Sequence, residues 1–459
     1  MKISESCKVN KTAERKEVEE KSMKITDLLG KKIIICDGAM GTMMQKYGLK
    51  VGELPELLSF THPEIIKEIH SAYFKAGSDF VSTNTFGCNR YKLKDSGYSV
   101  KQVVTQAVNL AKETAREVME QISGQDSLIK EKFVALDVAP LGKLMEPVGD
   151  LSFDEAYDMF KEQIVAGAAA GADFIFFETF TDIYEMKVAV LAAKENCDLP
   201  VFCSVTFQED GRMLMGSDPL TAVNILQDLG IDALGVNCSL GPKQIVGIVK
   251  EILAYSKLPV LVQPNAGLPV IVDGETVFNV DIEEYAEAMQ EMLQAGIAIA
   301  GGCCGTNPEY IAALVKSIKP ENNYPALSQN ADKIRKEKAM TAVSSSTKTV
   351  VLNDRIRIIG ERINPTGKKL LKEALKTKDF SYLENEAINQ IKAGAEILDI
   401  NVGLPEIDEH EMMLAAVKRV SSVVTAPLQI DSADPEVIEA AARYYNGKPI
   451  INSVNGKKE

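Results

Sequence analysis

The fold of this chain is predicted from a repeated unit that is complete in QAGIAIAGGCCG, residues 294–305. Gly296 has the position of the left-handed residue that ends a helix, and the apolar run 297–300 has the length of a buried strand. Two adjacent cysteines follow on a glycine-rich turn, and the next residues, TNPE, have the capping side chain and proline of a helix start. The two thiols therefore lie on the turn that leaves a strand, where α/β barrels carry their active residues.

The same order of helix, glycine and short apolar strand recurs along the chain, which is typical of βα units in a parallel sheet. Further glycine junctions lie at residues 75–80, 170–174 and 228–233. Eight strands are predicted, at Ile33–Asp37, Phe80–Thr85, Phe133–Val138, Phe174–Thr179, Val201–Phe207, Ala233–Cys238, Val260–Pro264 and Ile297–Gly302.

Eight consecutive units predict an α/β protein with a (β/α)8 TIM barrel over residues 24–320. An open, doubly wound sheet is the alternative, but it usually has fewer units and a phosphate-binding loop. The first turn, DGAMGT at residues 37–42, has glycines without the GxGxxG spacing of such a loop.

Composition and charge restrict the class of protein. The chain has 459 residues, of which 46% are apolar and 25% charged, as in a globular protein with an ample core. A net charge of −14 argues against nucleic acid or an acidic membrane as a partner. No apolar run approaches the ~18 residues that span a bilayer. Residues 1–23 form a charged tail without the apolar core of a signal peptide, and we expect the tail to be disordered and the protein cytoplasmic.

Cysteine and histidine usage points to thiol chemistry. Eight cysteines in a chain of this length, without an export signal, are expected to stay reduced. The chain has only three histidines, His62, His70 and His410. His62 precedes a proline and His70 falls in a helical pattern, positions typical of surface or core residues, so catalysis centred on histidine is not expected.

Polar residues end five of the predicted strands: Asp37, the run 83–85, Glu178, the pair 237–238 and the pair 303–304. The carboxyl ends of all barrel strands face one rim, and alternate strands contribute to the same interior layer. The sixth and eighth strands should therefore bring three thiols together although they are far apart in the sequence.

Three convergent thiols, Cys238, Cys303 and Cys304, make a sulfur-rich site that favours zinc. Three protein ligands leave the fourth tetrahedral position open, as in a catalytic zinc site, and no catalytic residue beyond this site is predicted. A disulfide is a competing interpretation, but neighbouring cysteines bridge each other only with strain. In another interpretation, Cys303 and Cys304 are simply two small hydrophobic residues that are buried in the core.

Five motifs, DGAMGT at 37–42, TNTF at 83–86, ETF at 178–180, VNCS at 236–239 and GGCCG at 301–305, together resemble the zinc-dependent homocysteine S-methyltransferase family. The resemblance implies that the three cysteines hold zinc and that the carboxylates of Asp37 and Glu178 hold the ammonium of homocysteine. It also implies that backbone amides near Gly38 and Ala39 bind the substrate carboxylate. Thr83 and Asn84 are placed in the same homocysteine site.

Residues 321–350 are polar and aperiodic, and a linker is predicted there. Residues 351–459 then begin a second βα series, which resembles the pterin-binding barrel shared by methyltetrahydrofolate-dependent methyltransferases and dihydropteroate synthase. The stretch offers less than half of a barrel, so an incomplete second barrel is predicted. The resemblance implies pterin contacts from residues at the strand ends: Asn364, Asp399, Asn401, Asp431 and Asn452.

The order of the two modules is similar to that in the cobalamin-dependent methionine synthases. The resemblance implies a methyltransferase that activates homocysteine as a zinc thiolate and methylates it to methionine. Methylcobalamin would be the methyl donor, carried by a corrinoid-binding domain or protein and recharged from 5-methyltetrahydrofolate. Two alternatives are a thiol methyltransferase that uses a betaine or sulfonium donor directly, and a non-catalytic zinc-binding protein.

Overall fold

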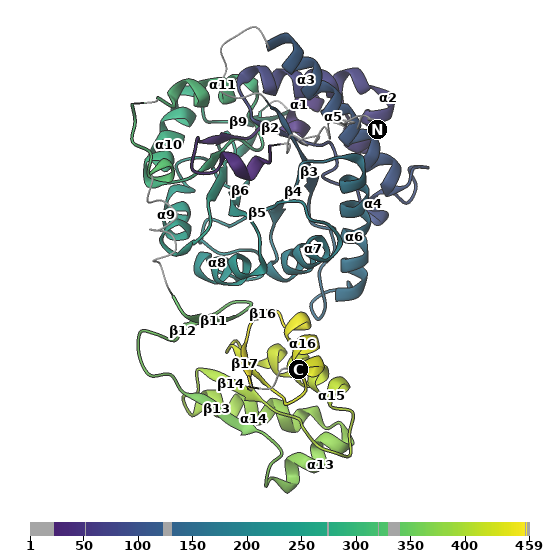
Figure 1. Cartoon of the computed structure of the whole chain (residues 1–459), viewed down its shortest axis with the longest axis vertical. Coiled ribbons are helices and arrows are strands. Elements are labelled where there is room, and N and C mark those ends of the chain that lie inside the picture. Colours follow the sequence, from purple (N-terminus) through teal and green to yellow (C-terminus); the bar gives the residue numbers. More distant parts are fainter. Residues whose placement is uncertain are drawn as a thin grey trace, which may run out of the picture.

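A computed structural model describes residues 23–50, 52–122, 131–272, 275–319, 321–328, 340–454 and 456. Apart from Met23, the tail predicted at residues 1–23 lies outside these ranges. The chain forms a large barrel, and a smaller α/β unit lies against one side of the barrel (Figure 1). Within the described ranges, no helix combines the length and the apolar character needed to cross a bilayer.

The eight predicted barrel strands are present and parallel. Their order in the sheet is β1-β10-β7-β6-β5-β4-β3-β2, so neighbours along the chain are neighbours in space. Their bounds are β1 Ile34–Ile35, β2 Phe80–Ser82, β3 Phe133–Val138, β4 Phe174–Phe180, β5 Val201–Val205, β6 Ala233–Asn237, β7 Val260–Gln263 and β10 Ile299–Ala300. The prediction of a (β/α)8 barrel is confirmed.

Helices surround the strands in the alternating order of the sequence (Figure 1). Three of them end in left-handed glycines, Gly77, Gly171 and Gly296, as the junction pattern predicts. The helices of the barrel are α1 Met40–Lys46, α2 Leu58–Thr61, α3 Pro63–Ala76, α4 Arg90–Leu93, α5 Val100–Ile122, α6 Phe153–Ala170, α7 Ile183–Asn196, α8 Pro219–Leu226, α9 Val246–Tyr255, α10 Ile282–Ala295 and α11 Pro308–Ser317. A hairpin of β8 Pro269–Val272 and β9 Glu275–Phe278 lies between β7 and α10 in the sequence.

Aromatic side chains fill part of the barrel core. The ring of Phe174 lies 5.0 Å from Phe80 in an edge-on arrangement and 4.8 Å from Phe202, centroid to centroid. All three rings are fully buried. Such pairs add roughly 0.5–1.5 kcal/mol each beyond the burial of their area, and here they join the walls of β2, β4 and β5.

Side-chain carboxylates contribute to the closure of the barrel between β1 and β2, which do not form a regular ladder. The Asp79 backbone N–H donates to the Ile35 carbonyl at 2.7 Å, and the Ile35 N–H donates to Asp79 Oδ2 at 2.8 Å. Nearer the rim, the Ser82 N–H donates to Asp37 Oδ2 at 2.8 Å. One of the predicted substrate-binding carboxylates is thus also part of this seam.

The second unit is a four-stranded parallel sheet with the order β13-β14-β15-β17. Within residues 340–454, β13 and β17 each pair on one side only, and Ile359 and Ile451 on these edges are 40% and 39% exposed. The elements are β13 Ile359–Ile363, α13 Lys369–Thr377, α14 Phe380–Lys392, β14 Ile397–Ile400, α15 Glu409–Val423, β15 Leu428–Asp431, α16 Pro435–Tyr444 and β17 Ile450–Asn452. The predicted incomplete second barrel is confirmed as this smaller parallel sheet.

The stretch predicted as an aperiodic linker contains regular structure at its end. Residues 342–351 form an antiparallel hairpin of β11 Ala342–Ser345 and β12 Thr349–Val351, and β16 Gly447–Lys448 pairs with β11 as a third strand. A short 3-10 turn, Pro325–Leu327, precedes the hairpin. The serine-rich composition predicts a loop, but contact with α8 buries β11: Asn224 Nδ2 donates to Ser344 Oγ at 2.7 Å.

The C-terminal end of α16 is anchored on α7 of the barrel. Lys187 Nζ, buried between the two units, donates to the carbonyls of Ala442 and Tyr445 at 2.8 and 2.6 Å. Tyr184 Oη donates to the carbonyl of Tyr444 at 2.8 Å. Burial and the charge of Arg443 lower the pKa of Lys187 to about 7. Because the last carbonyls of a helix have no partners within the helix, the amine of Lys187 caps the helix of the other unit.

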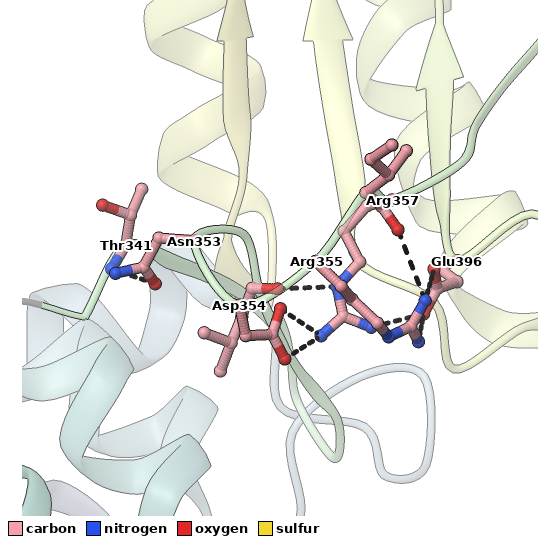
Figure 2. Close-up of polar contacts among 8 residues, drawn as sticks. Thr341, Asn353, Asp354, Arg355, Arg357 and Glu396 are labelled. Atoms are coloured by element: carbon pink, nitrogen blue, oxygen red, sulfur yellow. Dashed lines mark hydrogen bonds and ion pairs between the residues drawn. The ribbon is translucent and has the colours of Figure 1, made fainter.

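An ion-pair network fixes the start of β13 (Figure 2). Arg357 Nη2 donates to both carboxylate oxygens of Asp354, at 2.8 and 2.7 Å, and its Nη1 donates to Glu396 Oε1 at 2.7 Å. Arg355 also pairs with Glu396, at 2.6 Å. These contacts lie before the first strand of the second sheet, at the end opposite its polar strand ends, and therefore serve the packing of this unit.

Candidate metal centre

The three predicted thiols converge at the carboxyl ends of β6 and β10. The Sγ atoms of Cys238, Cys303 and Cys304 all lie within 4.8 Å of one another, and those of Cys238 and Cys304 are 4.0 Å apart. Sulfur ligands ~2.3 Å from a tetrahedral zinc ion lie about 3.8 Å apart, so the trio has the spacing of a zinc site. All seven cysteines in the described ranges are free, which removes the disulfide interpretation for these three.

The backbone that presents the thiols has unusual conformations at both strands. Cys238 has a φ of 62°, in the left-handed region that side chains rarely adopt, and Gly305 has a φ of +81°. A Cβ atom on Gly301 would collide with the side chain of Cys36. A Cβ atom would likewise collide with Thr306 at Gly302 and with Phe278 at Gly305, so close packing of the turn requires glycine on both sides of the cysteine pair.

The electrostatics of the trio favour a cation. Hydrogen bonds from Cys303 and Cys304 lower the pKa of Cys238 to about 3. The bond to Cys238 is in turn the first cause that raises the pKa of Cys303 and that raises the pKa of Cys304 to about 12. One thiolate is thus stabilised by two thiols, and a second negative charge is opposed by the first. A coordinated divalent ion removes this opposition, because a coordinating thiol is deprotonated outright.

Asn237 supports the metal centre from the second layer and was not assigned a role from the sequence. Its fully buried amide nitrogen donates to Thr179 Oγ1 at 2.8 Å and to Cys303 Sγ at 3.8 Å. Its Oδ1 accepts from the Thr179 N–H at 2.9 Å and from Ser204 Oγ at 2.8 Å. This amide connects β4, β5 and β6 to the cysteine pair, as outer-shell partners of metal ligands commonly do. The signal in the sequence that could have pointed to Asn237 is its place directly before Cys238, as a polar residue at the end of an apolar strand.

Asn265, which follows β7, is a second amide that the sequence did not single out. It is 4% exposed, and its side chain hydrogen-bonds Cys238, which helps to lower the pKa of that thiol. Its Oδ1 has no hydrogen-bond partner among the residues that the structure describes. A buried, unpaired oxygen beside three thiols could serve as an oxygen ligand when the fourth position of the metal is open.

Carboxyl groups line the mouth of the barrel beside the thiols. Asp37 is buried at the end of β1, and burial raises its pKa to about 7, against the opposing hydrogen bond from Ser82. Glu178 lies near the end of β4, and burial followed by the charge of Asp37 raises its pKa to about 8. In the described part of the chain, neither group forms an ion pair with lysine or arginine. The two predicted ammonium ligands therefore lie close enough to interact and have no cation partner.

The other predicted homocysteine contacts lie at the same rim. Gly38 has no room for a side chain, because a Cβ atom would lie 2.6 Å from Thr306 Oγ1, and the Ala39 N–H donates to that hydroxyl at 3.3 Å. Thr83 Oγ1 accepts from the Asp137 N–H at 3.1 Å, and Asn84 Nδ2 donates to the Pro55 carbonyl at 2.8 Å. The side chains of Thr83 and Asn84 thus already bond the barrel, and their contact with a substrate stays a prediction.

The predicted pterin residues share the carboxyl edge of the second sheet. Asn401 Nδ2 donates to Asp431 Oδ2 at 3.0 Å, and Asp431 is in register with Asn452 on β17. Asp399 is buried and bonded by Gln429; burial raises its pKa to about 6. Asn364 follows β13 and accepts from the Thr366 N–H at 3.0 Å. These acid and amide groups surround one end of the half-barrel, and their role in pterin binding stays a prediction.

Comparison with known proteins agrees with this arrangement. A family model described as Homocysteine S-methyltransferase matches residues 34–318, and one described as Pterin binding enzyme matches residues 360–459. Methionine synthases of Mycobacterium tuberculosis and Mycobacterium leprae are 31% and 30% identical to the chain over 446 and 447 residues. The alignments cover 94% of this chain and 36% of each relative, so the chain spans about a third of the length of these curated relatives.

Solved structures share the barrel. The homocysteine methyltransferase MmuM of Escherichia coli is 22% identical in its metallated form, with a TM-score of 0.54, over 62% of this chain and 96% of that chain. Its apo form is 23% identical, with a TM-score of 0.51. At this level of identity, the two similarities show the fold alone. The first family model covers more than half of the chain, on the barrel that brings the three thiols together, and the chain therefore belongs to the homocysteine S-methyltransferase family.

Proposed function

We propose that the chain is a zinc-dependent S-methyltransferase that methylates homocysteine to methionine. The observation that carries this proposal is the convergence of Cys238, Cys303 and Cys304 at the rim of a barrel of this family. These three residues would hold the zinc ion. When bound, zinc supplies a position in which a thiol is deprotonated at neutral pH, whereas a free thiol, with a pKa of ~8.5, is mostly protonated.

The chain's own residues position the amino acid part of the substrate. In this proposal the carboxylates of Asp37 and Glu178 accept hydrogen bonds from the ammonium group, and the backbone around Gly38 and Ala39 receives the carboxylate. Both acids lack a cation partner in the described part of the chain, so a bound ammonium would offset their buried charge. The substrate thiol would then lie at the cysteine trio, with its methyl-accepting sulfur toward the open rim.

The methyl donor of the proposal is methylcobalamin, presented by a corrinoid-binding domain or protein and recharged from 5-methyltetrahydrofolate. The match of residues 360–459 to pterin-binding enzymes and the similarity to methionine synthases support it. The residues at the strand ends of the second sheet (Asn364, Asp399, Asn401, Asp431 and Asn452) would contact the pterin. The free cysteines agree with a reducing compartment, and we place the protein in the cytoplasm.

Metal analysis combined with X-ray absorption tests the proposal. The purified chain should contain one zinc ion per molecule, and the number of sulfur neighbours of the metal should rise by one when homocysteine is added. Methionine should form from homocysteine and added methylcobalamin. A metal shell that does not change at saturating homocysteine would contradict the open-site proposal. If methionine formed from a betaine or sulfonium compound instead, that compound would replace methylcobalamin as the proposed methyl donor.

A further inference from the structure

Asp137 is a third carboxyl group at the mouth of the barrel. It lies on β3, one residue before the end of the strand, in the sequence FVALDV. The residue is only 4% exposed, and its Oδ1 has no hydrogen-bond partner among the described residues. The prediction from sequence treated Asp137 as part of an apolar strand and gave it no role.

The backbone of Asp137 is held firmly, so its carboxyl group has a defined position. Its N–H donates to Thr83 Oγ1 at 3.1 Å, and its carbonyl accepts from Thr85 Oγ1 at 2.6 Å. The two threonine hydroxyls are themselves 2.7 Å apart. This network attaches the end of β3 to the end of β2 at the rim where the predicted homocysteine residues lie.

The surroundings of the Asp137 side chain are acidic. Burial raises its pKa, and the charges of Glu178, Asp37 and Glu56 raise it further, whereas Lys92 lowers it. No lysine or arginine within the described ranges forms an ion pair with Asp137, Glu178 or Asp37. Isolated buried carboxylates are costly, so this part of the mouth favours a ligand that carries a positive charge.

A purely structural buried carboxylate of this barrel looks different. Asp79 is also fully buried, but Lys32 Nζ donates to its Oδ1 and the Ile35 N–H donates to its Oδ2, both at 2.8 Å. Asp37 at the mouth already accepts from the Ser82 N–H. Asp137 instead retains an unpaired oxygen, which is the acceptor that an ammonium group with three N–H donors requires.

We infer that Asp137 is a substrate-binding residue that, beside Glu178, accepts a hydrogen bond from the ammonium group of the amino acid thiol. This inference rests on the proposed function and deepens it. It makes a free α-ammonium group a requirement of the site, since among the described residues neither Asp137 nor Glu178 forms an ion pair with a lysine or an arginine. A thiol of equal length without the ammonium, 4-mercaptobutanoate, should lose the contribution of Asp137 altogether.

Calorimetry on the zinc-loaded 459-residue chain tests the inference with two ligands, homocysteine and 4-mercaptobutanoate. Asp137→Asn removes the negative charge that strengthens the hydrogen bond to the ammonium, and should weaken homocysteine binding roughly 10- to 100-fold. It should change the Kd of 4-mercaptobutanoate by less than about twofold. Glu185→Gln is the matched control, because Glu185 is also buried but accepts from the Leu141 N–H at 2.7 Å. It should leave the ratio of the two dissociation constants unchanged.

Zinc content and melting temperature, measured on every variant, separate binding from folding. Equal weakening of both ligands by Asp137→Asn, or weakening of neither, would overturn the inference while the proposed function stands. Asp137→Ser serves as a second variant, and failure of both variants to fold would assign Asp137 a structural role and overturn the inference. A wild-type chain that binds zinc but not homocysteine would refute the proposed function itself.

Discussion

At the scale of single residues, the site depends on three thiols, and they form the one candidate metal-binding group among the residues that the structure describes. Cys303→Ala is expected to lose most of the zinc and nearly all homocysteine methylation, because only two of the three sulfur ligands remain and two are too few to hold the metal. Metal analysis and a methionine assay measure both effects. Cys197→Ala, which removes a half-buried thiol on the outside of the barrel, is the control and should keep the metal. Full zinc and activity in Cys303→Ala would show that the metal assignment is wrong.

The amide of Asn237 is predicted to tune the metal centre. Asn237→Ala removes the N–H···S contact to Cys303 and both bonds to Thr179, so zinc affinity should fall about 10- to 100-fold. A competition titration against a chelating dye measures this affinity. Thr206→Val is the control: it removes only the hydroxyl that donates to the Asn237 backbone carbonyl at 3.0 Å, and it should leave the zinc affinity unchanged. If both variants bound zinc as tightly as the wild type, the supporting role of the Asn237 side chain would be excluded.

His70 is predicted to make the barrel sensitive to acid. It is fully buried in α3, has no hydrogen-bond partner in the described ranges, and burial lowers its pKa from 6.5 to about 4. The folded state therefore resists a proton that the unfolded state accepts, so stability is full above pH 6.5 and is lost as the pH falls toward 4. The loss approaches roughly 3 kcal/mol.

Thermal unfolding of the wild type and of His70→Leu between pH 4 and 7 measures this effect. The difference in melting temperature between the two proteins should shift in favour of the variant as the pH falls. The comparison cancels the titration of the buried acids, which both proteins share. A difference that stays constant across this range would contradict the prediction.

At the scale of helices and strands, the sequence predicts those elements whose signals are local. Glycines such as Gly77 and Gly171 end helices in the left-handed conformation, and polar residues appear where strands leave the barrel, so the eight strands and the rim follow from the sequence. The β8–β9 and β11–β12 hairpins do not follow, because their strands have only three or four residues, too few for a periodic pattern. The second hairpin is also held by contacts with distant residues, such as Asn224 on α8.

The same limit applies within the site. Asp137 is the one polar residue in a strand of six buried residues, and the sequence pattern predicts only that it belongs to the strand. The role of Asn237 depends on where its amide points, toward Thr179 and Cys303, and that direction is set by packing. The thiols could be predicted because adjacent cysteines between glycines are rare, whereas single amides and acids are common.

The α7–α16 contact is predicted to hold the second unit on the barrel. Lys187→Met keeps the length and the apolar stem of the side chain but leaves the carbonyls of Ala442 and Tyr445 buried without their donor. Leaving these carbonyls without a donor should cost roughly 1–3 kcal/mol of unfolding free energy. Chemical denaturation should show the second unit unfolding at a lower denaturant concentration. Lys418→Met, which removes the exposed pair with Glu146, is the control and should change little.

At the scale of the whole molecule, a complete barrel is joined to a sheet with two open edges. The four strands β13, β14, β15 and β17 place the predicted pterin residues at one end, but Ile359 and Ile451 on the outer strands stay exposed. A barrel removes its edges only by closing. The first unit therefore has the strands of a complete barrel, whereas the second has the strands of about half of one.

This difference predicts the activity of the 459-residue chain by itself. Homocysteine should be methylated when methylcobalamin is added, and no methionine should form from methyltetrahydrofolate alone. The folate nitrogen is a poor leaving group, and the second sheet surrounds at most part of a pterin. A steady-state assay with each donor, with and without added corrinoid, measures both rates. Steady methionine formation from methyltetrahydrofolate without any corrinoid would refute the donor assignment.

The seam between β1 and β2 has a consequence for how such an enzyme can evolve. Asp37 is predicted to recognise the substrate, yet its carboxylate also accepts the Ser82 N–H that helps to close the barrel wall. A lineage that shifted to a thiol without an amino group could discard Glu178 or Asp137 without opening that wall. It could not discard Asp37 so freely, because the same mutation would loosen the scaffold. Substrate choice should therefore drift by exchange at β3 and β4, while the acid on β1 persists after its original ligand has gone.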